Sequence, residues 1–135
     1  MIGPATAADE AALVTLWEAC GLTRPWNPPA RDIARALDGP ASTILVARSA
    51  GKIAGSVMVG HDGHRGWVYY LAVAPDARRG GLGRALMRAA EEWLRERGVP
   101  KLQLMVREGN AATYDFYRAL GFEEQPVAVF GRFLD

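Results

Sequence analysis

The sequence of 135 residues lacks paired cysteines, long apolar runs and an excess of either charge. Its only cysteine, Cys20, excludes an internal disulfide framework and a metal site built from several cysteines. No apolar run approaches the roughly 18 residues that a membrane-spanning helix requires. The 16 Lys and Arg residues against 15 Asp and Glu residues give a net charge of +1, which excludes nucleic-acid binding through bulk positive charge.

The remaining composition is typical of a globular protein. Half of the residues are hydrophobic and 23% are charged, which argues against disorder. A chain of this length can bury one core but not two, so we expect a single domain over residues 1–135. Residues 1–12 include Asp9 and Glu10 and no basic segment, so we expect no secretory signal and a cytoplasmic protein. The oligomeric state stays open, and a homodimer is compatible with the sequence.

Glycine and proline residues divide the chain into short elements. Apolar spacing and stop signals predict helices over residues 7–20, 31–37, 110–120 and from the glycines near 80 to about 97. Runs rich in β-branched and aromatic residues predict strands over 42–48, 52–59, 67–73, 101–106 and 127–134, with a short strand at 1–3. This order predicts an α+β fold in which helices cover the faces of a mixed sheet.

The connection from the predicted strand 67–73 to the next helix is the most informative stretch. It contains Arg78-x-x-Gly81-x-Gly83 and further arginines at 79 and 84. Unpaired backbone N–H groups at a helix N-terminus favour an anion, and glycines let that backbone approach a diphosphate without Cβ obstruction. The segment therefore predicts a pyrophosphate site. The alternative is that its glycines only form a tight strand-to-helix turn.

Two common phosphate motifs do not fit this segment. A P-loop requires Lys and then Ser or Thr after its last glycine, and here Gly83 is followed by Arg84 and Ala85. A dinucleotide fingerprint requires a third small residue where Leu86 stands, and an acidic residue that closes a second strand at the expected distance, where this sequence has none. A nucleotide hydrolase is therefore excluded.

A second group of residues follows the turn at Glu108-Gly109. Asn110 occupies a helix N-cap position, and Tyr117 lies two helical turns further along. An amide and a phenol therefore line one groove. The alternative is that Asn110 only caps the helix and the aromatic residues only pack the core, which we favour for Tyr114 and Phe116.

Together the two motifs resemble those of the GNAT superfamily of acyl-CoA-dependent N-acetyltransferases. The matching features are the strand 67–73 (WVYYLAV), Ala74-Pro75, Arg78-x-x-Gly81-x-Gly83 and Asn110-x6-Tyr117-x3-Gly121-Phe122. The resemblance covers essentially the whole chain in element order. It implies a three-layer α+β fold with a mixed, mostly antiparallel central sheet, helices on both faces and central strands that splay apart.

The resemblance also assigns roles to particular residues. Acetyl-CoA would be the cosubstrate, with no metal required. Its pyrophosphate would lie on backbone amides near the glycines, and its pantetheine arm would pair with the bulged central strand, where a backbone N–H would stabilise the oxyanion. Asn110 would contact that arm, and Tyr117 would be the catalytic acid that protonates the departing thiolate. The implied CoA-binding residues are Leu71, Ala72, Val73, Arg78, Arg79, Gly80, Gly81, Leu82, Gly83, Arg84, Asn110 and Tyr117.

The general base is not evident from the sequence. Many family members carry a Glu on the central strand or on the strand after it, and this chain has none at either place. The remaining candidates are Glu108, a water chain past Tyr69 or Tyr70, and the segment His61-Asp62-Gly63-His64, whose alternative role is a solvated hairpin turn.

The absence of a Glu at the usual base positions limits which acceptor amine such an enzyme can use. Removing a proton at pH 7 costs roughly 4–5 kcal/mol for a lysine side chain and about 1.4 kcal/mol for an α-amine of pKa near 8. We therefore expect a primary amine of low pKa, in a small molecule or at a peptide N-terminus. The loop 22–29 would line its site through Arg24 and Trp26. The alternative for this loop is a proline-stiffened segment whose Trp26 packs on the body.

Two functions remain open. The sequence favours an N-acetyltransferase over a CoA-binding sensor without catalysis, because Tyr117 supplies a proton donor. Cys20 lies on the apolar stripe of the first helix, so we expect a core residue rather than an acyl-carrying nucleophile.

Overall fold

The computed structural model describes residues 1–134, which form two compact units, one over Met1–Met105 and one that starts at Val106. The first unit contains a five-stranded sheet whose order in space follows the chain. All neighbouring strands are antiparallel except the last pair, which is parallel. The strands are β1 (Ile2–Pro4), β2 (Ser42–Ser49), β3 (Lys52–His61), β4 (Gly66–Val73) and β5 (Leu102–Gln103).

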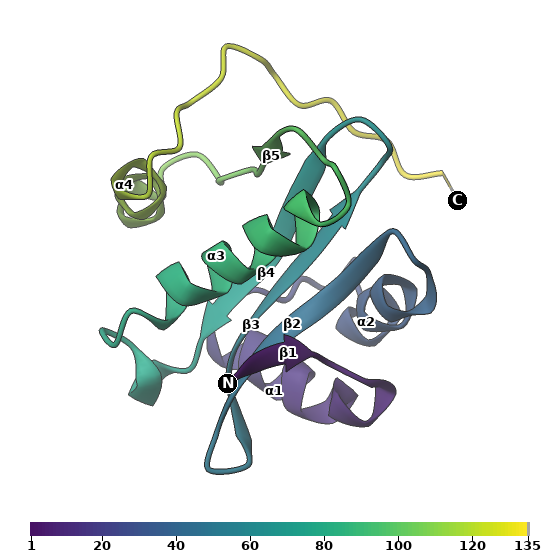
Figure 1. Ribbon diagram of the computed structural model, residues 1–135, viewed down its shortest axis with the longest axis vertical. Helices are drawn as coiled ribbons and strands as arrows, with labels where there is room; N and C mark the ends of the chain where they lie inside the picture. The colour runs from purple at the N-terminus through teal and green to yellow at the C-terminus, as the bar shows by residue number, and fades with distance from the viewer. Residues whose placement is uncertain (135) are drawn as a thin grey trace. The chain divides into compact units, whose positions relative to one another are not determined.

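Three helices cover the two faces of this sheet, as Figure 1 shows. Helices α1 and α2 lie on one face, and α3 lies on the other. The predicted three-layer α+β fold with a mostly antiparallel sheet is confirmed. That one domain spans residues 1–135 stays a prediction. The helices are α1 (Glu10–Ala19), α2 (Pro29–Asp38) and α3 (Leu82–Arg95), with short 3-10 turns at Ala7–Asp9 and Pro75–Ala77.

Apolar side chains fill both interlayer spaces. On the α1 and α2 face, the fully buried Trp17 and Ile33 pack with Ile44 and Val46 of β2. On the α3 face, Gly55 lets the helix approach closely, since a Cβ there would lie 2.9 Å from Cδ1 of Leu86. Burying this apolar surface is the main favourable contribution to the stability of the unit.

The hairpin between β2 and β3 closes through Ala50 and Gly51. Both residues have positive φ, 52° and 78°. Two consecutive left-handed residues match the twist of the flanking strands, which is why a two-residue turn serves here. The predicted turn at 49–51 is thereby confirmed.

The second unit contains one helix, α4 (Ala111–Ala119). The predicted strand over 127–134 is wrong, because the structure assigns no strand there and leaves the side chains of Val127, Phe130 and Leu134 exposed. Of the predicted strand 101–106, only β5 (Leu102–Gln103) is a strand in the structure. Apolar alternation predicts a strand only where a neighbouring edge supplies backbone hydrogen bonds, and local sequence does not contain that partner.

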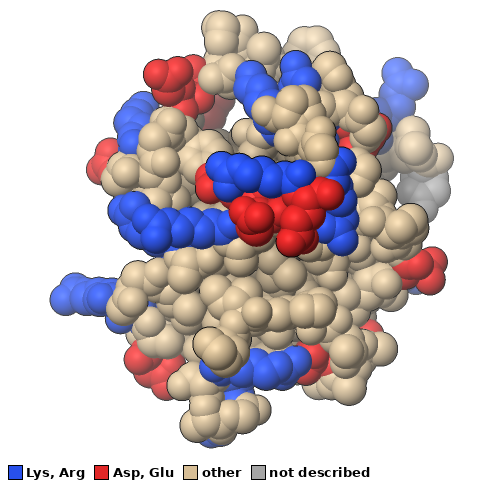
Figure 2. All heavy atoms as spheres, in the orientation of Figure 1, with Lys and Arg blue, Asp and Glu red and all other residues tan. Residues whose placement is uncertain are grey.

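Figure 2 shows acidic and basic side chains side by side on the visible face of the molecule. The ion pairs include Arg95 with Glu92 at 3.8 Å and Arg97 with Glu96 at 3.7 Å. Over residues 1–134, no helix is both long enough and apolar enough to cross a membrane.

We expect Gly55→Ala to lower the free energy of unfolding by about 1–3 kcal/mol. The added Cβ would lie 2.9 Å from Cδ1 of Leu86 and 3.0 Å from the backbone oxygen of Ala72. Gly39→Ala is the control, because no atom lies within 4 Å of its Cβ and its φ is −122°. Urea denaturation measures both variants, and equal stability would contradict the close packing of α3 on β3.

Candidate active site

A β-bulge interrupts β4 at Tyr70. Met58 of β3 pairs with Tyr69 and Ser56 pairs with Ala72, so Val57 alone faces both Tyr70 and the residue after it. Tyr70 has φ of 53°, in the left-handed region that non-glycine residues rarely adopt. Such strain persists only where the surroundings impose it, and it concentrates at functional sites. The bulge expected in the central strand is therefore present.

Contacts on both sides of Tyr70 hold this conformation. Its ring stacks on Trp17 with ring centroids 3.7 Å apart and planes 6° from parallel. The buried Ser56 hydroxyl accepts a hydrogen bond from Nε1 of Trp17 at 2.9 Å and donates one to the carbonyl of Tyr70 at 3.0 Å. Trp17 thus holds the side chain of Tyr70 and Ser56 holds its backbone, and these two neighbours are hydrogen-bonded to each other.

These contacts determine where the next backbone groups point. A trans peptide places its C=O and N–H on opposite sides, so the N–H of Leu71 points away from Ser56. The N–H of Ala74 donates to the carbonyl of Ala54 at 2.8 Å, and backbone groups alternate in direction along an antiparallel strand. Val73 therefore directs its N–H and its carbonyl toward the opposite edge of β4.

That edge of β4 is open. Within Met1–Met105, β5 pairs only with Gly66 and Trp67, and residues 68–73 have no partner strand on this side. The expected splay of the central strands is confirmed. An extended, amide-containing arm can hydrogen-bond to such an edge in the manner of an added strand.

The carbonyl oxygen of Val73 is already bound by the side chains of Arg78 and Cys20. Nε of Arg78 donates to it at 3.1 Å, and Sγ of Cys20 lies 3.4 Å away. The Arg78 side chain is therefore bound to the end of β4, and the N–H is the group of Val73 that remains for a ligand. Cys20 packs against the core as expected.

The glycine turn forms an open cradle before α3. Arg79 and Gly81 both have positive φ, 73° and 78°, and Gly81 is the N-cap. The first hydrogen bond of the helix runs from Ala85 to the carbonyl of Gly81, so the N–H groups of residues 82–84 precede the helical ladder. Apart from its chain neighbours, no atom lies within 4 Å of a Cβ built on Gly81, so the space beside this glycine is open.

In the second unit, Asn110 directly precedes α4 and Tyr117 lies within it. Oδ1 of Asn110 accepts a hydrogen bond from the N–H of Thr113 at 3.3 Å, so Asn110 is the N-cap. The ring of Tyr117 meets Phe116 and Phe122 edge-on at 5.0 and 5.7 Å. Burial raises the pKa of the Tyr117 phenol to about 12, so the phenol keeps its proton at neutral pH. Their contacts with CoA stay predictions.

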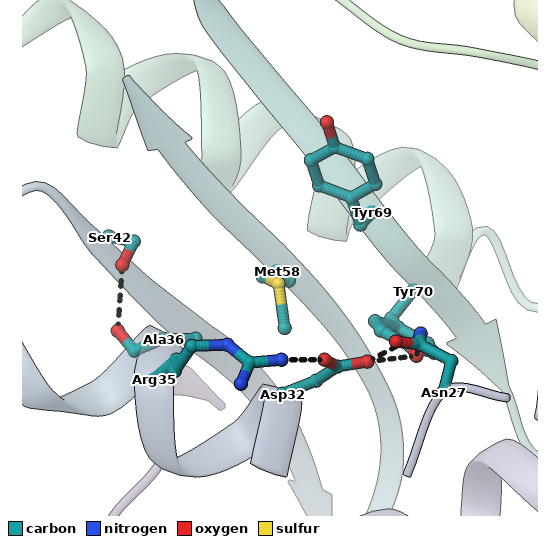
Figure 3. Close-up of a pocket in the computed structure, with 8 residues that line it drawn as sticks. All are labelled: Asn27, Asp32, Arg35, Ala36, Ser42, Met58, Tyr69 and Tyr70. Atoms are coloured by element: carbon teal, nitrogen blue, oxygen red, sulfur yellow. Dashed lines mark hydrogen bonds and ion pairs between the residues drawn. The ribbon is translucent and has the colours of Figure 1, made fainter. Parts of the chain in front are cut away.

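A pocket of about 370 Å³ lies beside the bulge on the face of α1 and α2, as Figure 3 shows. Asn27 is the only residue of the loop 22–29 that lines it. Arg24 instead donates to the carbonyls of Gly21 and Thr23, and Trp26 is 61% exposed, so neither alternative for Trp26 is confirmed. The lining residues are Asn27, Asp32, Arg35, Ala36, Ser42, Met58, Tyr69 and Tyr70.

The pocket contains a carboxylate that the sequence analysis missed. Oδ2 of Asp32 accepts hydrogen bonds from the hydroxyl of Tyr70 and the amide of Asn27, both at 2.7 Å. Oδ1 accepts one from Arg35 at 2.8 Å. Burial and the Asp32 carboxylate raise the pKa of Tyr70, which keeps its phenol a donor. No motif marks Asp32: Asn27 and Arg35 are near it in the sequence, but the phenol of Tyr70 that ties it to the bulge is 38 residues away.

Comparison with known proteins decides the family. The sequence profile of the Acetyltransferase (GNAT) family matches residues 11–122. The chain belongs to the GNAT family. It is 48% identical over 124 residues to an acetyltransferase of Pectobacterium atrosepticum, which covers 92% of this chain and 88% of that relative. The chain is therefore an acetyl-CoA-dependent N-acetyltransferase, a finding that disfavours the sensor without catalysis.

Solved GNAT structures share the fold. The ribosomal-protein-S18-alanine N-acetyltransferase of Escherichia coli matches with a TM-score of 0.79 and 28% identity, over 93% of this chain and 78% of that one. The structure of AAC(6′)-Iy in complex with the bisubstrate analogue CoA-S-monomethyl-acetylneamine matches with a TM-score of 0.82. That match covers 98% of this chain and 96% of the other at 18% identity, so it shows the fold alone.

The hairpin turn near residue 62 is structural in this GNAT protein. Asp62 accepts hydrogen bonds from the N–H groups of His64 and Arg65, both at 2.8 Å, and these bonds lower its pKa. The turn adjoins Gly66, four residues before Tyr70, which is about 13 Å along an extended strand. These contacts favour the solvated hairpin. Among residues 1–134, no group of three or more His, Cys, Asp or Glu could hold a metal ion.

We expect Ser56→Ala to destabilise the protein by about 1–3 kcal/mol, because the buried Nε1 of Trp17 and the carbonyl of Tyr70 each lose a partner. The exposed Ser49, on β2, supplies the control variant Ser49→Ala, which should stay within about 0.5 kcal/mol of the wild type. Urea denaturation measures both. Unchanged stability of Ser56→Ala would mean that this hydroxyl does not hold the bulge.

Proposed function

We propose that this GNAT enzyme binds acetyl-CoA along the open edge of β4 and transfers the acetyl group directly to a primary amine in a ternary complex. One observation carries the proposal: the bulge at Tyr70 and the unpaired edge of β4 lead directly into the glycine turn before α3. A strand edge for an amide-containing arm and a cradle for a diphosphate therefore follow one another along the chain.

The backbone supplies most of the proposed contacts with the cosubstrate. The N–H groups of residues 82–84 and the turn around Arg79 and Gly81 bind the pyrophosphate, where the helix dipole favours negative charge. The N–H groups of Leu71 and Val73 face the arm. Because the N–H of Leu71 points away from Ser56, it is the donor that we assign to the thioester oxygen.

The proposed reaction has two bond changes. The neutral amine attacks the thioester carbonyl, forms the new C–N bond and develops negative charge on the carbonyl oxygen. The C–S bond then breaks and the sulfur takes the proton of the Tyr117 phenol. The amine loses its proton to water, and through water that proton restores the Tyr117 phenol. The phenol is protonated at neutral pH and so can act as the donor; burial raises its pKa to about 12.

The best-supported acceptor is an amine of low pKa. The only carboxylate that lines the pocket, Asp32, already accepts three hydrogen bonds from Asn27, Arg35 and Tyr70, so its oxygens are engaged by the protein itself. An amine with a pKa near 8 loses its proton at pH 7 at a cost of only about 1.4 kcal/mol and so needs no strong base. The name of the Escherichia coli relative gives an alanine of ribosomal protein S18 as its target, in keeping with an α-amine acceptor.

We expect Tyr117→Phe to lower kcat by about 10²- to 10⁴-fold, because the departing thiolate loses its proton donor. The KM for acetyl-CoA should change little, since the ring and its contacts with Phe116 and Phe122 remain. Thiol release from acetyl-CoA over a panel of amines measures both constants.

Tyr114→Phe is the matched control on the same helix and should keep the wild-type kcat. Wild-type kcat in Tyr117→Phe would remove this phenol from the mechanism. Failure of the wild type to bind CoA in calorimetry would overturn the proposed function as a whole.

The pH dependence should show a rising limb only. For a peptide α-amine as acceptor, kcat/KM should increase as pH passes the amine pKa of about 8 and then stay level to about pH 10. The phenol of Tyr117 keeps its proton over this range because its pKa is raised to about 12. A fall in rate with a midpoint below pH 10 would contradict the assigned acid. Equal kcat/KM for an α-amine and a lysine side chain at pH 7 would contradict the acceptor class.

A further inference from the structure

The pocket beside the bulge presents no uncompensated negative charge. Asp32 is the only acidic residue that lines it, and the Asp32 side chain is 13% exposed. Three donors already bind its two oxygens, and one of them is the guanidinium of Arg35. A polycationic acceptor would therefore find one neutralised carboxylate here, which is a poor match for several ammonium groups.

The hydrogen-bond donors that remain unused at the pocket include those of Arg35, whose charge is balanced by Asp32. A guanidinium has five N–H donors in a planar fork, and Arg35 uses one nitrogen on Asp32. Its side chain is 69% exposed, so the remaining donors are accessible at the pocket. Figure 3 shows the guanidinium of Arg35 reaching Asp32 from α2. A carboxylate is the partner that matches such a fork.

The rest of the lining is largely apolar. Met58 and Tyr69 are a cross-strand pair on the same face of the sheet, and Ala36 faces them from α2. The volume of about 370 Å³ lies at the small end of the range of about 300–1,000 Å³ for small-molecule sites. The pocket therefore fits a small ligand with an apolar body and one anionic group.

We propose that the acceptor is a free α-amino acid with an apolar side chain, whose carboxylate pairs with Arg35 and whose side chain lies against Met58 and Tyr69. This inference rests on the proposed function, because it takes the pocket beside the bulge as the acceptor site. It goes further in naming the acceptor class and the residue that selects it. Arg35 acts as a specificity-determining residue that binds the acceptor and takes no part in the bond changes.

Pairing with Arg35 also assists the chemistry. In a free amino acid, the carboxylate stabilises the neighbouring ammonium and so keeps the pKa of the amine high. A guanidinium bound to that carboxylate cancels much of its charge, which lowers the cost of removing the proton from the amine. Binding through the carboxylate thus provides the low-pKa amine that a site without a strong base requires.

The test compares amino acids with their amides. Leucine, methionine and phenylalanine are each paired with the corresponding primary amide, which keeps the side chain and the amine but lacks the carboxylate. For the wild type, we expect kcat/KM at least about tenfold higher for each amino acid than for its amide. The neutral fraction of the amine favours the amide, so this preference would run against intrinsic reactivity.

Substitution of Arg35 should remove the preference. Arg35→Gln is expected to raise the KM for the amino acids about tenfold or more and to leave the amides unchanged. Arg35→Lys, which keeps the charge but loses the fork, should fall between Arg35→Gln and the wild type. Arg31→Gln is the matched control, because Arg31 is exposed on the same helix and does not line the pocket. Thermal denaturation checks that each variant is folded.

Calorimetry distinguishes a failure of the proposed acceptor class from a failure of the proposed function. Binding of leucine to the CoA-loaded wild type, weakened about tenfold or more in Arg35→Gln, supports the acceptor class even if no amine is turned over. Absent turnover would then count against the proposed function alone. Equal kcat/KM or equal affinity for amino acid and amide would overturn the inference. An unchanged preference for amino acids over amides in Arg35→Gln would also overturn it. The same holds if a peptide or an aminoglycoside is a better acceptor than every amino acid.

Discussion

The left-handed backbone of Tyr70 is the constraint on which the arrangement of this site depends. A non-glycine residue at φ of 53° is strained, and the strain is offset by the stack on Trp17, the Ser56 hydroxyl on the carbonyl and the hydrogen bond to Asp32. These partners come from α1, β3 and α2. The bulge is therefore a property of the packed sheet and its two helices, and anything that loosens this packing should also relax the backbone at Tyr70.

The same residue connects the two proposed substrate sites. Its phenol helps to form the wall of the acceptor pocket through Asp32 and Asn27. Its carbonyl is held by Ser56, and this orients the N–H of Leu71 away from β3. Donor and acceptor are thus proposed to meet at one bulge, with the acetyl carbon on one side and the amine on the other. The neighbours of Tyr70 fix its conformation before either substrate binds. The N–H of Leu71 and the wall of the pocket are therefore already in position.

Local sequence was enough to predict most elements and the glycine turn. Periodicity located the helices and most strands, and Arg78-x-x-Gly81-x-Gly83 indicated the cradle before α3. The strand expected over 127–134 was wrong, because a strand depends on a partner edge that no local pattern contains. Asp32 was missed for a similar reason: it lies on a short amphipathic helix, 38 residues from the phenol that it binds.

The sequence by itself determined the chemistry that is encoded in contiguous motifs: the fold class, the glycines that leave backbone N–H groups accessible, and the cap at Asn110 with Tyr117 seven residues beyond. Only the tertiary structure decided which side chains share a pocket. Asn27, Asp32, Arg35 and Tyr70 come together because α2 and the loop before it pack against the bulged strand. Helix and turn preferences act over a few residues, whereas side-chain contacts across a sheet depend on how whole elements pack.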